Sequence, residues 1–158
     1  MIANGEKRYI GTTRFSDATW EENVRWRKKH EWRGCMYGLT KGIAKKVPRM
    51  ALVYVLEMNN TTNQIMGIGL IRNFTNENHT SIVYYSDPDY NRRIYNSAYR
   101  RDRSEIANKK MLAALENLVF KGSRHFKRGQ GITVVPMKRF RGDNIQSLVS
   151  AFFFSLFK

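Results

Sequence analysis

The sequence predicts one α+β domain in which a small, curved β-barrel is flanked by helices. Helix-type and β-rich segments follow one another with no internal repeat and no linker, which is the pattern of such a domain. The best β-rich pair lies at residues 50–72 and carries Gly67 and Gly69 on one side of its second strand, where glycine allows a sheet to bend. The chain has 158 residues, a length that supports one hydrophobic core without disulfides.

The first helix is expected over residues 16–32, SDATWEENVRWRKKHEW. Ser16 or Thr19 can cap its start, and Thr19 with Glu22 fits a capping box. Acidic residues stand near its start and basic residues near its end, as the helix dipole favours. Residues 33–50 are rich in Gly and Lys, which predicts a loop with extended pieces.

Residues 50–72 predict an antiparallel hairpin. The run from Met50 to Met58 is almost continuously apolar and rich in β-formers, and Gln64 to Arg72 is a second run of this kind. The turn is expected at Asn59–Asn63. Two more short strands are expected on either side of the sequence SDPDYN at residues 86–91.

The second half of the chain predicts two more helices and one strand. A helix is expected over residues 104–120, capped by Ser104 and ended by Gly122. Residues 131–135 are expected as a buried strand, and residues 143–157 as a closing helix with Asp143 at its cap. The apolar face of the helix at 104–120 should consist of Ile106, Leu112, Leu115, Leu118 and Val119.

Charge is the main indication of function. The chain has 28 Lys and Arg residues against 13 Asp and Glu residues, so its net charge is +15. A field of this sign attracts polyanions, and nucleic acid is the first expectation. An acidic protein or lipid surface is the alternative partner. The apolar share of 42% is that of a folded protein rather than a disordered one.

The segment from Phe120 to Gly142 contains seven Lys or Arg residues and no acid. Its glycines allow the main chain to approach a phosphate closely. A basic loop at each end of a buried strand would then present phosphate contacts on a rigid support. The predicted contacts in this segment are Lys121, Arg124, His125, Lys127, Arg128, Gly129, Gly131, Arg139 and Arg141.

Aromatic residues lie among the basic residues of the chain, and unpaired bases stack on such rings. Tyr84 and Tyr95 are the predicted stacking residues, because a tyrosine hydroxyl favours a wet edge. Arg100 and Arg101 are predicted to form the second wall of a binding groove.

No enzymatic or cofactor-binding motif is present, so a non-enzymatic protein without a cofactor is expected. His30, His79 and His125 are far apart, and none stands at metal-ligand spacing from another histidine or a cysteine. Asp87 and Asp89 leave a metal-dependent nuclease as a minor alternative, although an Asp-Pro-Asp sequence is also typical of turns.

Cys35 is the only cysteine, so no internal disulfide can form and a reducing, intracellular setting is expected. The first ten residues have no apolar leader, and no run reaches the roughly 18 apolar residues that a membrane span requires. The apolar side chains of the phenylalanine-rich C-terminal segment spread too far around a helix for all of them to reach one core. It is expected either to contact a protein partner or a second copy, or to wrap across the barrel. Its large apolar side chains are Phe152, Phe153, Phe154, Leu156 and Phe157.

The order of these elements resembles the PUA-like superfamily, which includes the PUA, ASCH, EVE and YTH domains. The resemblance covers about residues 30–136 and depends on the strand Ile65-Met66-Gly67-Ile68-Gly69-Leu70-Ile71. It implies a small curved barrel with flanking helices that binds RNA or a modified base. No base-binding cage can be matched residue by residue.

The composition, rich in Asn, Lys, Tyr and Ile, also resembles that of small proteins of large DNA viruses. Two functions are therefore expected. The first is a module that binds RNA or single-stranded DNA in the cytoplasm or nucleus. The second is a basic structural or genome-packaging protein inside a virion, bound to nucleic acid or to an acidic partner.

Overall fold

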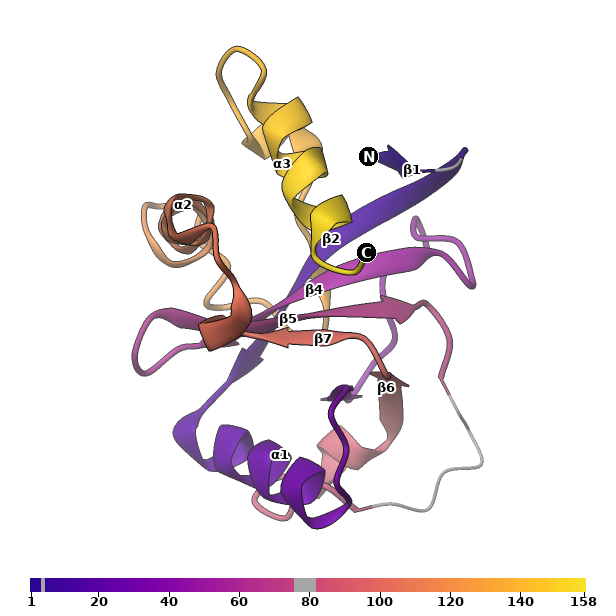
Figure 1. Cartoon of the computed structure of the whole chain (residues 1–158). Coiled ribbons are helices and arrows are strands. Elements are labelled where there is room, and N and C mark those ends of the chain that lie inside the picture. The colour runs from indigo at the N-terminus through magenta and orange to yellow at the C-terminus, as the bar shows by residue number, and fades with distance from the viewer. Residues whose placement is uncertain (4, 76–81) are drawn as a thin grey trace.

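The computed structural model describes residues 1–3, 5–75 and 82–158, so that His79 lies outside the described residues. It shows an α+β fold, as predicted from the sequence. A mixed sheet lies in the middle, with helices α2 and α3 on one face and helix α1 on the other (Figure 1). A two-stranded sheet, β3 with β6, lies on the same side as α1.

The main sheet has the order β1-β2-β4-β5-β7, and β8 pairs with β2 outside this path. Strands β2 and β4 are parallel, and the other pairs are antiparallel. The described strands do not close into a ring, so the curved sheet is present but the predicted closed barrel is not seen among them. The strands are β1 (Ile2–Ala3), β2 (Glu6–Phe15), β3 (Cys35–Leu39), β4 (Leu52–Asn59), β5 (Gln64–Arg72), β6 (Arg93–Ser97), β7 (Arg100–Asp102) and β8 (Thr133–Val134).

The predicted hairpin is confirmed as β4 and β5, with its turn at residues 60–63. The Asn59 side chain orders the turn, because its Oδ1 accepts the amides of Thr61 and Thr62 at 2.9 and 3.2 Å. Asn63 adopts a left-handed conformation with φ of 56°, which asparagine tolerates better than most residues.

The described residues form three α-helices, and the capping of each differs from the predicted capping in detail. Ser16 caps α1, but its capping box is completed by Thr19, not by a Thr19–Glu22 pair. Asn108 caps α2, which begins five residues later than predicted because residues 103–105 form a separate 3-10 turn. Asn144, in the left-handed region, precedes α3, so the predicted Asp143 cap is wrong. The helices are α1 (Asp17–Lys29), α2 (Lys109–Phe120) and α3 (Ile145–Ser155). The 3-10 turns are η1 (Pro88–Asn91), η2 (Arg103–Glu105) and η3 (Met137–Arg139).

The sequence interpretation missed β2, the longest strand of the sheet. Its residues, EKRYIGTTRF, are mostly polar, yet β2 pairs with β4 along its length and with β8 on its other edge. Strand β2 lies before residue 30, outside the range of residues 30–136 that was expected to hold the barrel core. The strand predicted at residues 131–135 is shorter than expected and consists of Thr133–Val134.

Two hydrophobic cores lie on the two faces of the main sheet. Along β4, Tyr54, Leu56 and Met58 face α2 and α3, whereas Val53 and Val55 face α1 and β3. Both faces are buried, which explains why β4 is an almost continuous apolar run rather than an alternating one.

The phenylalanine-rich C-terminal segment packs on its own chain. Phe152 and Phe153 are buried, while Phe154, Leu156 and Phe157 are half-buried against the same core. The segment therefore packs across the sheet on its own chain, as one of the two alternatives expected, and the contact with a partner or a second copy stays a prediction. Among the described residues, the helices are too short or too polar to span a bilayer.

Candidate nucleic-acid interface

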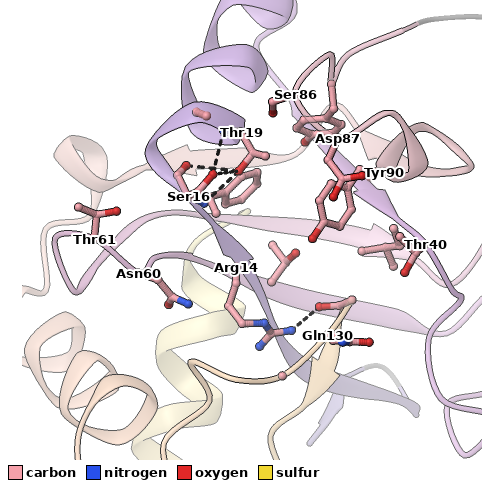
Figure 2. Close-up of a pocket in the computed structure, with 18 residues that line it drawn as sticks. Arg14, Ser16, Thr19, Thr40, Asn60, Thr61, Ser86, Asp87, Tyr90 and Gln130 are labelled. Carbon is pink, nitrogen blue, oxygen red and sulfur yellow. Dashed lines mark hydrogen bonds between the residues drawn. The ribbon is translucent and has the colours of Figure 1, made fainter.

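A cavity of about 620 Å³ opens where β2 ends and α1 begins. Its other walls are the end of β3 at residues 38–40, the segment at residues 84–90, the turn after β4 and the loop at residues 129–131 (Figure 2). It joins parts of the chain that are far apart in the sequence. Labelled residues around it include Arg14, Ser16, Thr40, Asn60, Asp87, Tyr90 and Gln130.

Arg14, near the end of β2, connects this cavity to the basic segment at residues 120–142, which is called the basic loop below. Its Nη1 donates to Thr12 Oγ1 at 2.9 Å and to the carbonyl of Phe126 at 3.0 Å. Its Nη2 donates to Thr133 Oγ1 at 3.1 Å and to the carbonyl of Gly131. These bonds hold the segment from Phe126 to Thr133 against the sheet, so the loop is presented on a fixed support.

Arg14 forms no ion pair with the described residues. No carboxylate of the described residues lies within 4.0 Å of its guanidinium. Burial lowers the pKa of Arg14 to about 10, which still leaves it protonated at neutral pH. Because both Nη atoms of Arg14 already donate to protein acceptors, this charge attracts an anion in the cavity through its electric field rather than through a direct hydrogen bond from these atoms.

The two loop glycines line the cavity, and each has a structural reason. A Cβ on Gly129 would lie 2.8 Å from Arg14 Nη1 and 2.8 Å from Thr133 Oγ1, so only glycine leaves room for the arginine. Gly131 has φ of +65°, a conformation that glycine adopts without strain. Both predicted loop glycines therefore lie at the cavity.

The seven predicted side chains of the basic loop lie at or near the surface. Arg139 lies 5.1 Å from the centre of the Phe126 ring and donates to the carbonyl of Arg124 at 3.1 Å. Partial desolvation and the charges of Arg124 and Arg141 lower the pKa of Arg139, because nearby positive charges disfavour its protonated form. No ion pair among the described residues involves any of the seven. Exposed are Lys121, Arg124, Arg128 and Arg141; half-buried are His125, Lys127 and Arg139.

The two predicted stacking tyrosines are both buried, and only one reaches the cavity. Tyr84 is 2% exposed, lines the cavity and receives a hydrogen bond on its hydroxyl from Asn23 at 2.8 Å. Tyr95 is 3% exposed and its hydroxyl accepts the amide of Ile43, away from the cavity. Tyr95 is therefore part of the core, contrary to the prediction.

Tyr90 is the ring that the site prediction missed. It is half-buried, lines the cavity and meets Tyr84 edge to face, with 6.1 Å between ring centres. Its position follows the Asp-Pro-Asp turn, where a tyrosine at the edge of a cavity cannot be told from a core tyrosine by sequence alone.

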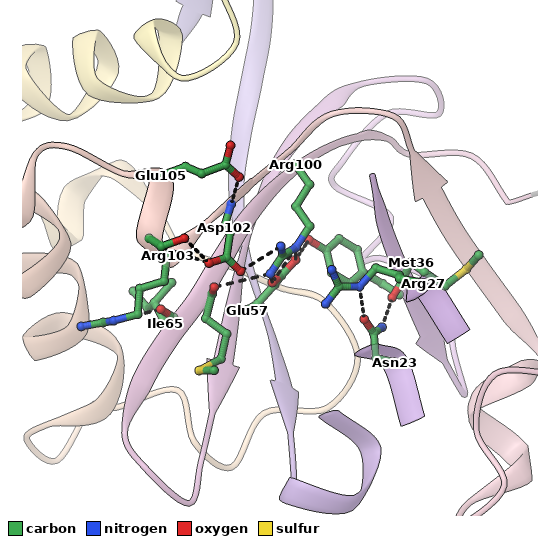
Figure 3. Close-up of polar contacts among 12 residues, drawn as sticks. Asn23, Arg27, Met36, Glu57, Ile65, Arg100, Asp102, Arg103 and Glu105 are labelled. Carbon is green, nitrogen blue, oxygen red and sulfur yellow. Dashed lines mark hydrogen bonds and ion pairs between the residues drawn. The ribbon is translucent and has the colours of Figure 1, made fainter. Parts of the chain in front are cut away.

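Arg100 does not form a second wall of the groove. It is buried, and its Nη2 and Nη1 pair with Glu57 at 2.7 Å and Asp102 at 3.2 Å (Figure 3). Tyr37 donates to the same Glu57 carboxylate at 2.6 Å. Burial alone would lower the pKa of Arg100, but Glu57 outweighs this and raises it. Because its charge is neutralised inside the protein, Arg100 is a structural residue.

Arg101 also lies away from the cavity. It is half-buried, with its guanidinium 5.2 Å from the centre of the Phe157 ring, and it lines a separate groove between α2 and α3. The predicted wall of Arg100 and Arg101 is therefore absent from the cavity, and Arg14 supplies the charge there instead.

The two aspartates considered for a nuclease site, Asp87 and Asp89, do not both line the cavity. Asp89 lies 3.9 Å from Arg92 in an exposed ion pair, whereas Asp87 lines the cavity. Among the described residues, no group of three or more His, Cys, Asp or Glu side chains is arranged to hold a metal ion.

None of three comparisons with known proteins found a match: a scan against models of protein families, a search of curated proteins and a search of solved structures. The function is therefore inferred from the geometry of the chain itself.

Proposed function

We propose that the protein is a non-enzymatic module that binds RNA or single-stranded DNA. One nucleotide enters the cavity, and the neighbouring phosphates lie along the basic loop. The observation that carries this proposal is the cavity itself, where the unneutralised Arg14 guanidinium, the glycine loop and the Tyr90 ring meet. Its curved sheet flanked by helices is compatible with a PUA-like fold.

The cavity favours single strands over a duplex. A base can reach Tyr90 only if it leaves its stack, and an unpaired base does this at little cost. The phosphates of the same strand would then meet a surface on which residues 117–142 contain no acid. Aromatic rings beside a basic groove are the usual arrangement for binding single strands.

The double variant Lys127→Ala, Arg128→Ala should bind single strands more weakly without losing stability. The loop is held by main-chain contacts, since Asn60 Nδ2 donates to the Lys127 carbonyl at 2.9 Å and Arg14 binds its other end. The log–log salt dependence of the affinity should become shallower by roughly one to two units. The measurement is a fluorescence-anisotropy titration at several salt concentrations, with a thermal melt of each variant.

A matched control is Lys109→Ala, Lys110→Ala, which removes the same charge from the exposed start of α2. It should change the salt dependence much less. If both double variants weaken binding equally, or if the protein binds heparin and duplex DNA as well as single strands, the packaging alternative is favoured and the proposed cavity site is wrong.

Tyr90→Ala should lower the affinity for single strands by about 1–3 kcal/mol, the usual range for one stacked base. The salt dependence should stay as in the wild type, because the change removes no charge. Tyr84→Ala is a poorer test, since the Tyr84 hydroxyl is bonded inside the core. An unchanged affinity of a stably folded Tyr90→Ala protein would show that no base stacks in this cavity.

A further inference from the structure

We infer that the nucleotide in this cavity is a guanine nucleotide, selected by the carboxylate of Asp87. This inference rests on the proposed function and names the base that the same site takes. It follows from the state of Asp87, from the distribution of charge around the cavity and from the hydrogen-bonding edges of the four bases.

The Asp87 carboxylate makes no hydrogen bond or ion pair within the part of the chain that the structure describes. It stands immediately before η1, yet its side chain makes no capping hydrogen bond there. It forms no ion pair among the described residues, although its neighbour Asp89 does so with Arg92. Its main-chain carbonyl, by contrast, accepts the amide of Tyr90 at 3.1 Å. The backbone of Asp87 is therefore engaged, while its carboxylate has no partner among the described residues.

The segment that carries Asp87 is anchored on both sides. Ser86 donates from its amide to the buried Glu22 carboxylate at 3.1 Å, and its hydroxyl donates to the same group. Asn91 Nδ2 donates to the carbonyls of Tyr84 at 2.7 Å and Pro88 at 3.1 Å. These contacts fix the main chain next to Asp87, so the carboxylate is held at the cavity rather than on a loose loop.

The charged groups lie in different walls of the cavity. Arg14 and Gln130 lie together in one wall, and Asp87 lies beside Tyr90 in another (Figure 2). A carboxylate repels phosphate, so it does not suit a surface that binds only a sugar-phosphate backbone. It suits a ligand with an anionic part near Arg14 and an edge of N–H donors near Asp87.

A second unpaired acceptor points to the same kind of ligand. The Oδ1 atom of Asn60, a residue of the cavity wall, is buried and has no donor among the described residues. Buried acceptors are seldom left without a donor. Asp87 is exposed, so solvent can satisfy its carboxylate, whereas Asn60 Oδ1 is buried; a ligand with N–H donors would meet both acceptors in this cavity.

Among the common bases, guanine alone has two adjacent N–H donors on its Watson–Crick edge, at N1 and N2. A carboxylate accepts at both oxygens and donates at neither. The edges of adenine, cytosine and uracil each place an acceptor beside the donor, so the second carboxylate oxygen would face a lone pair. Asp87 therefore favours guanine through a two-bond pair and disfavours the other three bases.

The test uses the whole protein and labelled uridine octamers that carry guanosine, adenosine, cytidine or inosine at one central position. Fluorescence anisotropy gives each affinity at constant salt. A two-bond pair to a base discriminates by about 1–3 kcal/mol, so the guanosine strand should bind about 5- to 150-fold more tightly than the adenosine or cytidine strand. Inosine, which lacks the N2 amino group, should fall between them.

Asp87→Asn should abolish this preference, because an amide presents one donor and one acceptor. The control Asp89→Asn makes the same change of charge two residues away, on a carboxylate paired with Arg92, and should keep the preference. Both variants should melt as the wild type does, which separates loss of recognition from loss of folding.

The possible outcomes separate this inference from the proposed function. If the wild type binds all four octamers equally, or if Asp87→Asn retains a preference for guanosine, the inference is overturned while single-strand binding stands. If the wild type binds none of the octamers, single-strand binding is itself overturned, and the guanine inference falls with it.

Discussion

Replacing Glu57 by Gln should destabilise the protein by about 3 kcal/mol. The change leaves Arg100 buried beside a neutral group and weakens the hydrogen bond from Tyr37. Breaking a buried ion pair by removing one partner costs about 3–5 kcal/mol. The low end applies here because Asp102, which is partly exposed, still lies 3.2 Å from Arg100. Urea unfolding followed by circular dichroism measures the difference.

Two further variants decide what the loss means. Glu6→Gln breaks the exposed pair with Arg72 and should cost no more than about 1 kcal/mol. The triple change Glu57→Leu, Arg100→Met, Tyr37→Phe replaces both buried charges and the hydroxyl that would lose its acceptor, and it should recover most of the lost stability, because the penalty arises from unpaired buried groups. A Glu57→Gln protein as stable as Glu6→Gln would show that the pair does not form.

Gly69→Ala should destabilise the protein by about 1–3 kcal/mol, the range for overfilling a packed core. A Cβ at Gly69 would lie 2.3 Å from the Tyr37 hydroxyl oxygen and 2.8 Å from the Cys35 sulfur. Both residues are buried in β3, so neither can move away freely. Displacement of Tyr37 would also strain its hydrogen bond to Glu57. Thermal unfolding measures the loss.

Gly42→Ala is the matched control, because the nearest atom to its Cβ would be the Tyr95 hydroxyl oxygen at 3.5 Å, an ordinary contact. It should change stability by less than about 0.5 kcal/mol. Equal melting temperatures for the two variants would contradict the packing described here.

The same contacts correct the interpretation of the two glycines in β5. The sequence predicted that Gly67 and Gly69 let a sheet bend toward closure. Gly69 instead leaves room for side chains of β3, and a Cβ at Gly67 would lie 2.5 Å from Arg100 Nη2. Their spacing of two does place both on one face, as predicted, but what approaches that face is a set of side chains.

The buried Arg100 lies near Arg27, which is linked by hydrogen bonds to a residue of the candidate site. The charge of Arg100 lies close enough to Arg27 to help lower its pKa, after the larger effect of burial. Arg27 Nε donates to Asn23 Oδ1 at 2.8 Å, and Asn23 in turn donates to the Tyr84 hydroxyl at the cavity. Two hydrogen bonds therefore link Arg27 to Tyr84 at the cavity, whereas Arg100 acts on Arg27 through its charge alone.

The sequence by itself determined the features that depend on neighbouring residues. The hairpin of β4 and β5 follows from two β-rich runs around an asparagine turn. Helices α1 and α2 follow from capping residues, charge order and apolar spacing, although α1 ends three residues earlier and α2 begins five residues later than predicted. The acid-free loop follows from a simple count, and its glycines do lie at the cavity. Periodicity, caps and turns are local, so they can be recognised in the sequence.

The tertiary structure alone decided which charged and aromatic side chains are free. Arg14 and Arg100 are both arginines in strands, but one is held by carbonyls 112 and 117 positions away and the other by a carboxylate 43 positions away. Tyr90 and Tyr95 are five positions apart, and only Tyr90 lines the cavity. Strand β2 was missed because its burial depends on pairing with β4 and β8, not on its own polar sequence. Whether a charge is available to a ligand depends on partners brought together by long-range pairing, and no local pattern records those partners.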